Sequence, residues 1–326
     1  MPGRRLSPRA LVHPGVGAGA VVVAVLAVGP LLLSRYWVGF LLGVFVMVSL
    51  ATSYDILGGF AGYLNLGHAT FFGVGAYAFT ILAGREVAVP LALIAAVVAP
   101  VLLTLVAGPP LLRLRGVYFA IAAFGLVVLF RVLAYNFSDL TGGAAGLTLI
   151  TAIEQRTVYW ALLALAAAAV LITFALTRSR AGLALEAIRE DEEVAEAFGV
   201  RPGIAKLAAM ALSAAIAGLT GALYAVDVFF IGPETVFGLT IALTPIVMAL
   251  VGGSGVVGGP LLGAVLLFTL SEQARALIGE YSLLFYGVVL TLTGLFMPGG
   301  ALRLLRARQR RARRRRAVPA SPVRAP

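Results

Sequence analysis

Apolar runs long enough to cross a membrane as helices follow one another along almost the whole chain. This pattern constrains the fold more than any other feature. The hydrocarbon core of a bilayer is about 30 Å thick, and a helix needs roughly 20 apolar residues to cross it. Of the 326 residues, 61% are hydrophobic and 12% are charged, whereas soluble domains carry about 25% charged residues. The sequence therefore predicts an all-α, polytopic bundle of transmembrane helices with no large soluble domain.

About ten spans are predicted where apolar runs are bounded by glycine, proline or charge. They cover residues 17–34, 38–57, 66–83, 88–108, 117–135, 157–177, 206–226, 239–252, 256–275 and 282–297. The first run follows three arginines, as in a signal peptide, but no small-residue cleavage site comes after it, so we expect an uncleaved helix. The predicted parts are a basic N-terminus (1–16), a transmembrane domain (17–300) and a basic tail (301–326).

The basic residues lie mainly on one side of these predicted spans. With the N-terminus in the cytoplasm, twenty of the 25 Lys and Arg residues fall in cytoplasmic segments and four in outer loops, while Arg131 lies within a span. Because short cytoplasmic loops of membrane proteins are enriched in Lys and Arg, both termini are predicted to be cytoplasmic, which requires an even number of crossings. We expect an inner-membrane protein.

The tail is strongly basic, with arginine at nine of the fourteen positions from 303 to 316. Such a run beside a last span is attracted to anionic lipid, which explains it better than nucleic-acid binding does. The Pro- and Ala-rich end at 317–326 is expected to be disordered.

The sequence lacks the residues that several kinds of binding site and reaction require. The chain has no cysteine and two histidines, so disulfides and cysteine-ligated metals are excluded, no metal cluster is predicted and no cofactor is expected. A phosphate-binding P-loop needs a glycine-rich turn ending in Lys, but the only lysine, Lys206, stands between Ala205 and Leu207. An ATPase site is therefore absent, and we do not expect an enzyme. Asp55, Asp227 and Glu272 fall near the ends of spans, which disfavours a carrier coupled to protons or sodium.

The cytoplasmic loop at 178–205 holds six of the fourteen acidic residues. Leu185, Ile188, Ala195 and Phe198 recur at near-helical spacing, and Gly199 is a suitable end, which predicts one solvated amphipathic helix. It is either a plain connector or a docking helix for a cytoplasmic partner. In the second case Arg178 and Arg180 would anchor the start of the helix at the membrane surface.

Two glycine-rich stretches, the first at 58–68 and the second at 252–260, interrupt the apolar pattern. Irregular backbone at membrane depth must be covered by protein or line a water-filled cavity, so these two stretches indicate a translocation path. A third stretch, at 141–147, lies in the longest predicted outer loop, where it is either a gate at the outer mouth or a flexible loop. Glycine also allows helices to pack closely and chains to turn, and this alternative stays open. The candidates for a path or gate are Asn65, Gly67, His68, Gly73, Gly75, Thr141, Gly142, Gly143, Gly252, Gly253, Gly258 and Gly259.

Residues 62–77, with the sequence GYLNLGHATFFGVGAY, resemble the signature of membrane permeases of branched-chain amino-acid ABC importers. Four further stretches are similar to that family in the same order. They are LRLRGVYFAI at 112–121, TGGAAGL at 141–147, the loop segment at 179–199 and VGGSGVVGGP at 251–260. The resemblance covers roughly residues 38–300, and the stretches at 112–121 and 141–147 look like the longer of the family's two permease subunits.

The resemblance implies a heterodimer with a second permease, two cytoplasmic ATP-binding subunits and an extracytoplasmic solute-binding protein. It also implies a bacterial inner membrane and a loop at 178–205 that couples to the ATPase. Glu186, Ala187 and Gly199 match the family's motif, and the candidate coupling residues are these three together with Arg178, Arg180 and Arg189. Tyr63 and Asn65 stand where relatives commonly have Gln and Ser, which leaves urea or short amides as alternative solutes. A stand-alone secondary carrier or channel is a second possibility. A membrane-embedded enzyme lacks any set of reactive residues.

Overall fold

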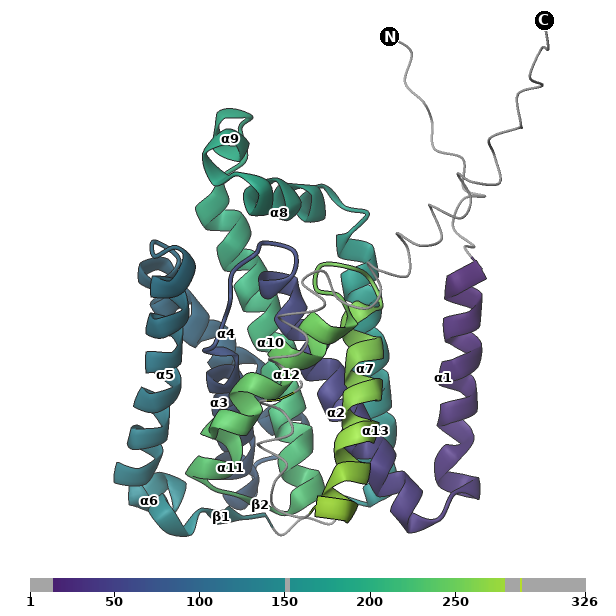
Figure 1. Cartoon of the computed structure of the whole chain (residues 1–326). Coiled ribbons are helices and arrows are strands. Elements are labelled where there is room, and N and C mark those ends of the chain that lie inside the picture. Colours follow the sequence, from purple (N-terminus) through teal and green to yellow (C-terminus); the bar gives the residue numbers. More distant parts are fainter. Residues whose placement is uncertain (1–13, 150–152, 279–287, 289–326) are drawn as a thin grey trace, which may run out of the picture.

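The structure, a computed structural model, describes residues 14–149 and 153–278 together with Val288. The described chain is a helical bundle with a single pair of two-residue strands (Figure 1). In this part of the chain, six helical segments are long and apolar enough to cross a membrane, and two further apolar helices are shorter. The prediction of a polytopic helix bundle is confirmed. The predicted span at 282–297 and the tail at 301–326 lie outside the described residues.

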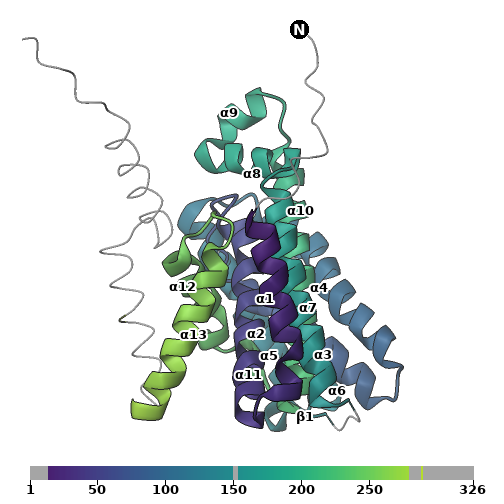
Figure 2. The ribbon, with the colours of Figure 1, turned by 90° about the vertical axis from the view of Figure 1, so that its right-hand side faces the viewer.

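The long helices agree with the predicted spans to within a few residues at most ends. They are α1 (Pro14–Leu32), α2 (Arg35–Gly58), α3 (His68–Gly84), α4 (Val89–Leu111), α5 (Gly116–Asn136), α7 (Gln155–Leu176), α10 (Pro202–Val228), α12 (Leu239–Gly252) and α13 (Gly259–Ile278). Helix α1 stands at the edge of the bundle beside α7 (Figure 2). Leu102 of α4 and Ile121 of α5 are among many exposed apolar side chains on the outer helices, as expected of a surface that meets lipid.

Helix α10 lies at the centre and packs against α2, α3, α4 and α7. Small residues make this contact close: a Cβ atom added to Gly75 of α3 would meet the backbone of Gly218 in α10. In a membrane, where water does not drive helices together, such close backbone approach is a principal source of attraction between helices.

An irregular linker, residues 59–67, joins α2 to α3. It does not simply turn back at the end of α2, because His68, the first residue of α3, has its Nε2 atom 3.1 Å from Oγ of Ser53 in α2. Ser53 lies five residues before the end of α2, which is about 7.5 Å along a helix that rises 1.5 Å per residue. The linker therefore descends into the bundle before α3 begins, and the shortness of α3 follows.

Two short helices, α8 (Arg180–Glu190) and α9 (Glu192–Ala197), stand beyond one end of the bundle (Figure 1). The prediction of one continuous helix here is wrong, because Asp191 leaves the helical conformation and caps α9. Its Oδ1 atom accepts hydrogen bonds from the backbone N–H groups of Glu193 and Val194 at 3.0 and 3.1 Å. Gly199 ends the segment with a positive φ of 87°, and Pro202 begins α10, as predicted.

The opposite end of the bundle carries small elements that connect the loops there. They are α6 (Ser138–Thr141), the 3₁₀ turn η2 (Gly143–Ala145), the strands β1 (Leu147–Thr148) and β2 (Phe230–Ile231), and α11 (Pro233–Phe237). The strands pair antiparallel, with Leu147 opposite Ile231. The third glycine stretch is thus built into this outer layer.

Candidate functional site

The two protruding helices present a different face to the surroundings from the one the sequence predicted. Leu185 and Ile188 of α8 and Ala195 of α9 are buried against the rest of the protein. Phe198, which we had placed on that same face, is 86% exposed, and Leu183 and Val194 are also exposed. The break at Asp191 explains the difference, because it ends the periodicity that one long helix would impose. The free apolar side chains of this segment are therefore Leu183, Val194 and Phe198.

Helix α8 is attached to the first glycine stretch. Nη1 of Arg189 donates a hydrogen bond of 2.6 Å to the carbonyl oxygen of Gly59. Gly59 also lies against Gly255 of the second stretch, at 252–260. Asp55 holds the turn of this stretch, because its carboxylate accepts hydrogen bonds from Oγ of Ser254 at 2.7 Å and from the backbone N–H of Gly255 at 2.9 Å. Arg189 and both stretches border one cavity of about 400 Å³, together with Glu186 of α8.

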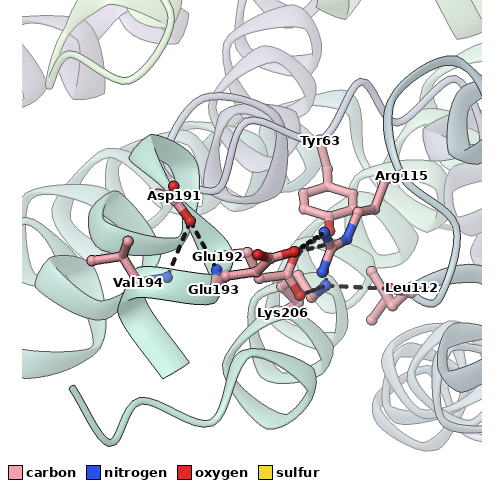
Figure 3. Close-up of polar contacts among 8 residues, drawn as sticks. All are labelled: Tyr63, Leu112, Arg115, Asp191, Glu192, Glu193, Val194 and Lys206. Carbon is pink, nitrogen blue, oxygen red and sulfur yellow. Dashed lines mark hydrogen bonds and ion pairs between the residues drawn. The ribbon is translucent and has the colours of Figure 1, made fainter. Parts of the chain in front are cut away.

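Helix α9 is attached through an ion pair whose ammonium is buried and whose carboxylate is partly buried (Figure 3). Nζ of Lys206, whose side chain is 3% exposed, lies 2.7 Å from Oε1 of Glu192. The same ammonium donates to the hydroxyl of Tyr63 at 2.8 Å and to the carbonyl oxygen of Leu112 at 3.2 Å. Tyr63 in turn donates to Oε2 of Glu192 at 2.9 Å. We call Tyr63, Glu192 and Lys206 the junction; it joins the linker, α9, α10 and the turn after α4.

Charge and burial act on the junction in opposite directions. Burial by itself would raise the pKa of Glu192, but the hydrogen bonds from Lys206 and Tyr63 and the charges of Lys206 and Arg115 lower this pKa below its ordinary value. Burial raises the pKa of Tyr63, which keeps its hydroxyl protonated and able to donate. Arg115, whose side chain is 62% exposed, adds looser contacts to Glu192 and Glu193 at 3.7 and 3.4 Å. The junction thus holds a buried ammonium beside a carboxylate whose side chain is 18% exposed, and the two charges compensate each other.

The predicted coupling residues lie together on or beside α8. Arg178, Arg180 and Glu186 are exposed, whereas Ala187 is partly buried. The guanidinium of Arg178 stacks over the ring of Phe174 at 4.1 Å. Gly199 lies at the end of the segment, after α9. Arg189 is the member that the structure connects directly to the glycine stretches.

The predicted path residues divide into packing and turn positions. Gly67 lies against the backbone of Ala123, Gly73 against the ring of Phe237, and Gly252 against Gly259. Gly142, Gly143, Gly253 and Gly258 have positive φ angles, which glycine adopts at turns.

The polar candidates of the path are buried. The Nδ1 and Nε2 atoms of His68 lie within 3.4 Å of Ser213 and Ser53. The side chain of Asn65 accepts a hydrogen bond from the N–H of Gly67 at 3.0 Å. Thr141 is buried and donates to the carbonyl oxygen of Ala134 at 2.6 Å. Each of these polar groups therefore contributes to the structure of the described subunit.

Sequence reasoning missed the junction and the role of Asp55. In the sequence Lys206 counts toward the orientation and toward the exclusion of a P-loop, and Glu192 is one of six acids in the loop; neither pattern pairs the two residues. A signal was present, because a lone lysine at the start of an apolar span must find a partner if it is buried. Its partners lie 143, 94 and 14 residues away, so the sequence gives no indication of which groups they are.

Known proteins resemble this chain over most of its length. The family described as the permease component of the branched-chain amino acid transport system matches residues 36–294. The high-affinity branched-chain amino acid transport system permease protein LivM of Escherichia coli is 32% identical, over 88% of this chain and 75% of that protein. The LivM protein of Salmonella typhimurium is 31% identical, over 85% and 72%. No solved structure matches the chain.

Proposed function

Because the chain belongs to the family of branched-chain amino acid transport permease components, we propose that it forms the membrane pathway of an ABC importer for branched-chain amino acids. It does so as one half of a heterodimer with a second permease. Two cytoplasmic ATP-binding subunits supply the energy, and an extracytoplasmic binding protein delivers the solute. The chain itself is a transport subunit of the membrane and not an enzyme.

In this proposal the chain crosses the membrane ten times with both termini in the cytoplasm. The bias of Lys and Arg in the sequence supports this orientation. Helix α1 begins at the same end of the bundle as α8 and α9 (Figure 1), which agrees with a cytoplasmic N-terminus. The arginines at 303–316 would then contact anionic lipid. The division into 1–16, 17–300 and 301–326 belongs to the same proposal.

The ATP-binding subunits dock on α8 and α9. The observation that carries this proposal is the position of these helices beyond the apolar bundle. Arg189 of α8 lies there against Gly59 of the first glycine stretch and Gly255 of the second. Leu183, Val194 and Phe198 offer apolar side chains to a partner, and the exposed residues Arg178, Arg180 and Glu186 border or flank them. An exposed Phe at the tip of a short helix is the kind of side chain that anchors a protein interface.

The solute passes along a central path around which the helices packed through glycine rock against each other. Gly67, Gly73 and Gly75 lie on α3 or at its start, and Gly252, Gly253, Gly258 and Gly259 surround the turn between α12 and α13. Thr141, Gly142 and Gly143 belong to the outer layer, where the path opens to the binding protein. Asn65 and His68 lie where the linker meets α3.

Purification of the tagged chain from membranes in mild detergent tests the assembly. We expect a second permease and a P-loop ATPase to co-purify in stoichiometric amounts, as identified by mass spectrometry. Recovery of the chain alone, without ATPase activity, would favour the stand-alone carrier or channel. Uptake of labelled leucine and of labelled urea by the purified complex in liposomes, with its binding protein, then separates the two classes of solute.

Charge reversal on α8 tests the coupling role of this helix. Exchanging the charges in the double variant Glu186→Arg with Arg189→Glu is expected to leave the complex inserted while uptake per ATP hydrolysed falls. Because Arg189 also bonds to Gly59, the single variant Glu186→Arg is needed beside it. Glu154→Arg, at an exposed position that precedes α7 at the opposite end, is the control. Normal coupled uptake in both α8 variants would contradict the proposal.

A further inference from the structure

We propose that the junction of Tyr63, Glu192 and Lys206 transmits the movement of α8 and α9 to α3, and that Lys206 is its central positioning residue. The inference rests on the proposed function and adds the route by which an ATPase docked on the cytoplasmic helices acts on the membrane helices. The route is the linker at 59–67.

The ion pair makes α9 and the linker move together. The ammonium of Lys206 has three N–H donors, and the structure gives them three acceptors: Glu192, the hydroxyl of Tyr63 and the carbonyl oxygen of Leu112. Separating α9 from this group would leave a buried charge without its counter-ion, which is strongly unfavourable. Helix α9 is therefore expected to carry Tyr63 with it when a partner displaces it.

The linker is also held at its first residue. Arg189 of α8 donates to the carbonyl oxygen of Gly59 at 2.6 Å, and a Cβ atom at Gly62 would lie 3.0 Å from Cγ of the same arginine. Helix α8 thus holds the start of the linker through Arg189, and α9 holds its middle through the hydrogen bond between Glu192 and Tyr63. A linker held at two points transmits a displacement, whereas a linker held at one point can rotate around it.

The far end of the linker leads directly to the contacts of α3. Gly67 lies against the backbone of Ala123 in α5, and His68 lies between Ser53 of α2 and Ser213 of α10. A shift of the linker therefore changes the position of α3 relative to three helices of the bundle. Because Gly75 and Gly218 let the backbones of α3 and α10 approach closely, the two helices can stay in contact while α3 shifts.

Variants of the junction in the complete complex, reconstituted in liposomes, test the route. We compare uptake of radiolabelled leucine with ATP hydrolysis stimulated by the binding protein. Lys206→Met and Glu192→Gln are expected to keep ATP hydrolysis while leucine transported per ATP falls by about tenfold, within the usual range of coupling between sites. Tyr63→Phe, which removes only the hydroxyl, is expected to have a smaller effect in the same direction.

Two further variants keep the test informative if a single change prevents folding. Lys206→Met with Glu192→Leu removes both charges. Replacement of both members of a buried ion pair by apolar residues of similar volume is often tolerated, so we expect an assembled complex that hydrolyses ATP but transports poorly. Lys206→Glu with Glu192→Lys exchanges the charges and is expected to restore part of the coupling. Arg115→Gln is the matched control, because Arg115 touches the same Glu192 from an exposed position and should leave coupling unchanged.

The outcomes separate this inference from the proposed function. If the wild-type complex contains no ATPase or shows no ATP-driven uptake, the proposed function itself fails. If the wild-type complex couples normally and the variant without either charge transports as much leucine per ATP, the importer assignment stands and the junction is only a structural contact. Equal loss of ATP hydrolysis and uptake in every junction variant would likewise overturn the inference.

Discussion

Arg189 and Gly59 lie 130 residues apart in the chain, yet Nη1 of the arginine donates a 2.6 Å hydrogen bond to the carbonyl oxygen of the glycine. Through this bond helix α8 reaches the end of α2. Since Gly59 also lies against Gly255, the same contact brings the helix to both glycine stretches that stand far apart in the sequence.

The bond between Arg189 and Gly59 should protect the start of the linker from local opening. Arg189→Leu removes a hydrogen bond from a charged donor, which costs about 1.5–3 kcal/mol, and amide hydrogen exchange at 59–63 should become faster. Arg180→Leu removes an exposed arginine of the same helix and should leave that exchange unchanged. Identical exchange rates in the two variants would contradict a holding role for Arg189.

Close packing of α3 on α10 should depend on the absence of a side chain at Gly75. A methyl group there meets the backbone of Gly218, and overpacking of this kind costs about 1–3 kcal/mol. Gly75→Ala should therefore lower the midpoint of thermal unfolding in detergent. Gly125→Ala is the control, because a Cβ atom on that glycine of α5 meets nothing within 4 Å; a loss of the same size in both variants would show that helix propensity or lipid contacts decide the effect.

The turn between α12 and α13 should loosen when Asp55 is changed. Asp55→Ala leaves the N–H of Gly255 and the hydroxyl of Ser254 without the acceptor that they have now, and an unsatisfied buried group costs about 1–3 kcal/mol. Ser254→Ala removes one of these donors together with its bond and should cost less. Limited proteolysis at 253–258 measures the opening, and a turn equally resistant in wild type and Asp55→Ala would refute the prediction.

The junction should weaken in acid and not near neutrality. Folding lowers the pKa of Glu192 below its ordinary value of 4.5, so the unfolded chain binds more protons than the folded chain in that region. The stabilisation is complete above pH 4.5 and is lost as the pH falls through the lowered pKa. Between pH 8 and 5.5 the difference in thermal midpoint between wild type and Glu192→Gln should stay constant, and it should shrink below pH 4.5. A difference that already shrinks at pH 6 would point to another group.

Local patterns in the sequence predicted most of the membrane helices, because a span needs only a sufficient run of apolar residues. The ends of helical segments were also predictable where the cause was local, as at Gly199 after α9 and at Pro202, where α10 begins. The break at Asp191 was not, since a carboxylate that caps a helix and one that lies on its solvated face look alike in a string of acids. Phe198 was consequently placed on the wrong face.

The candidate site was predictable only in part, for the same reason. Glu186 and Arg189 can be named as candidates because they belong to a continuous motif, and their coupling role stays a prediction. The partners of Lys206 come from the linker, the turn after α4 and α9, and only the packing of α10 brings them together. Whether a glycine serves a turn or a close contact likewise depends on the opposing helix, as Gly218 shows for Gly75.

Lys206 is the only lysine in the sequence, so reagents that acylate side-chain amines have a single target in this chain. Its amine is enclosed by Glu192, Tyr63 and Leu112 and is shielded from such reagents as long as α9 stays in place. The rate at which this amine is acetylated would therefore measure how often α9 detaches from the bundle, with no label added to the chain.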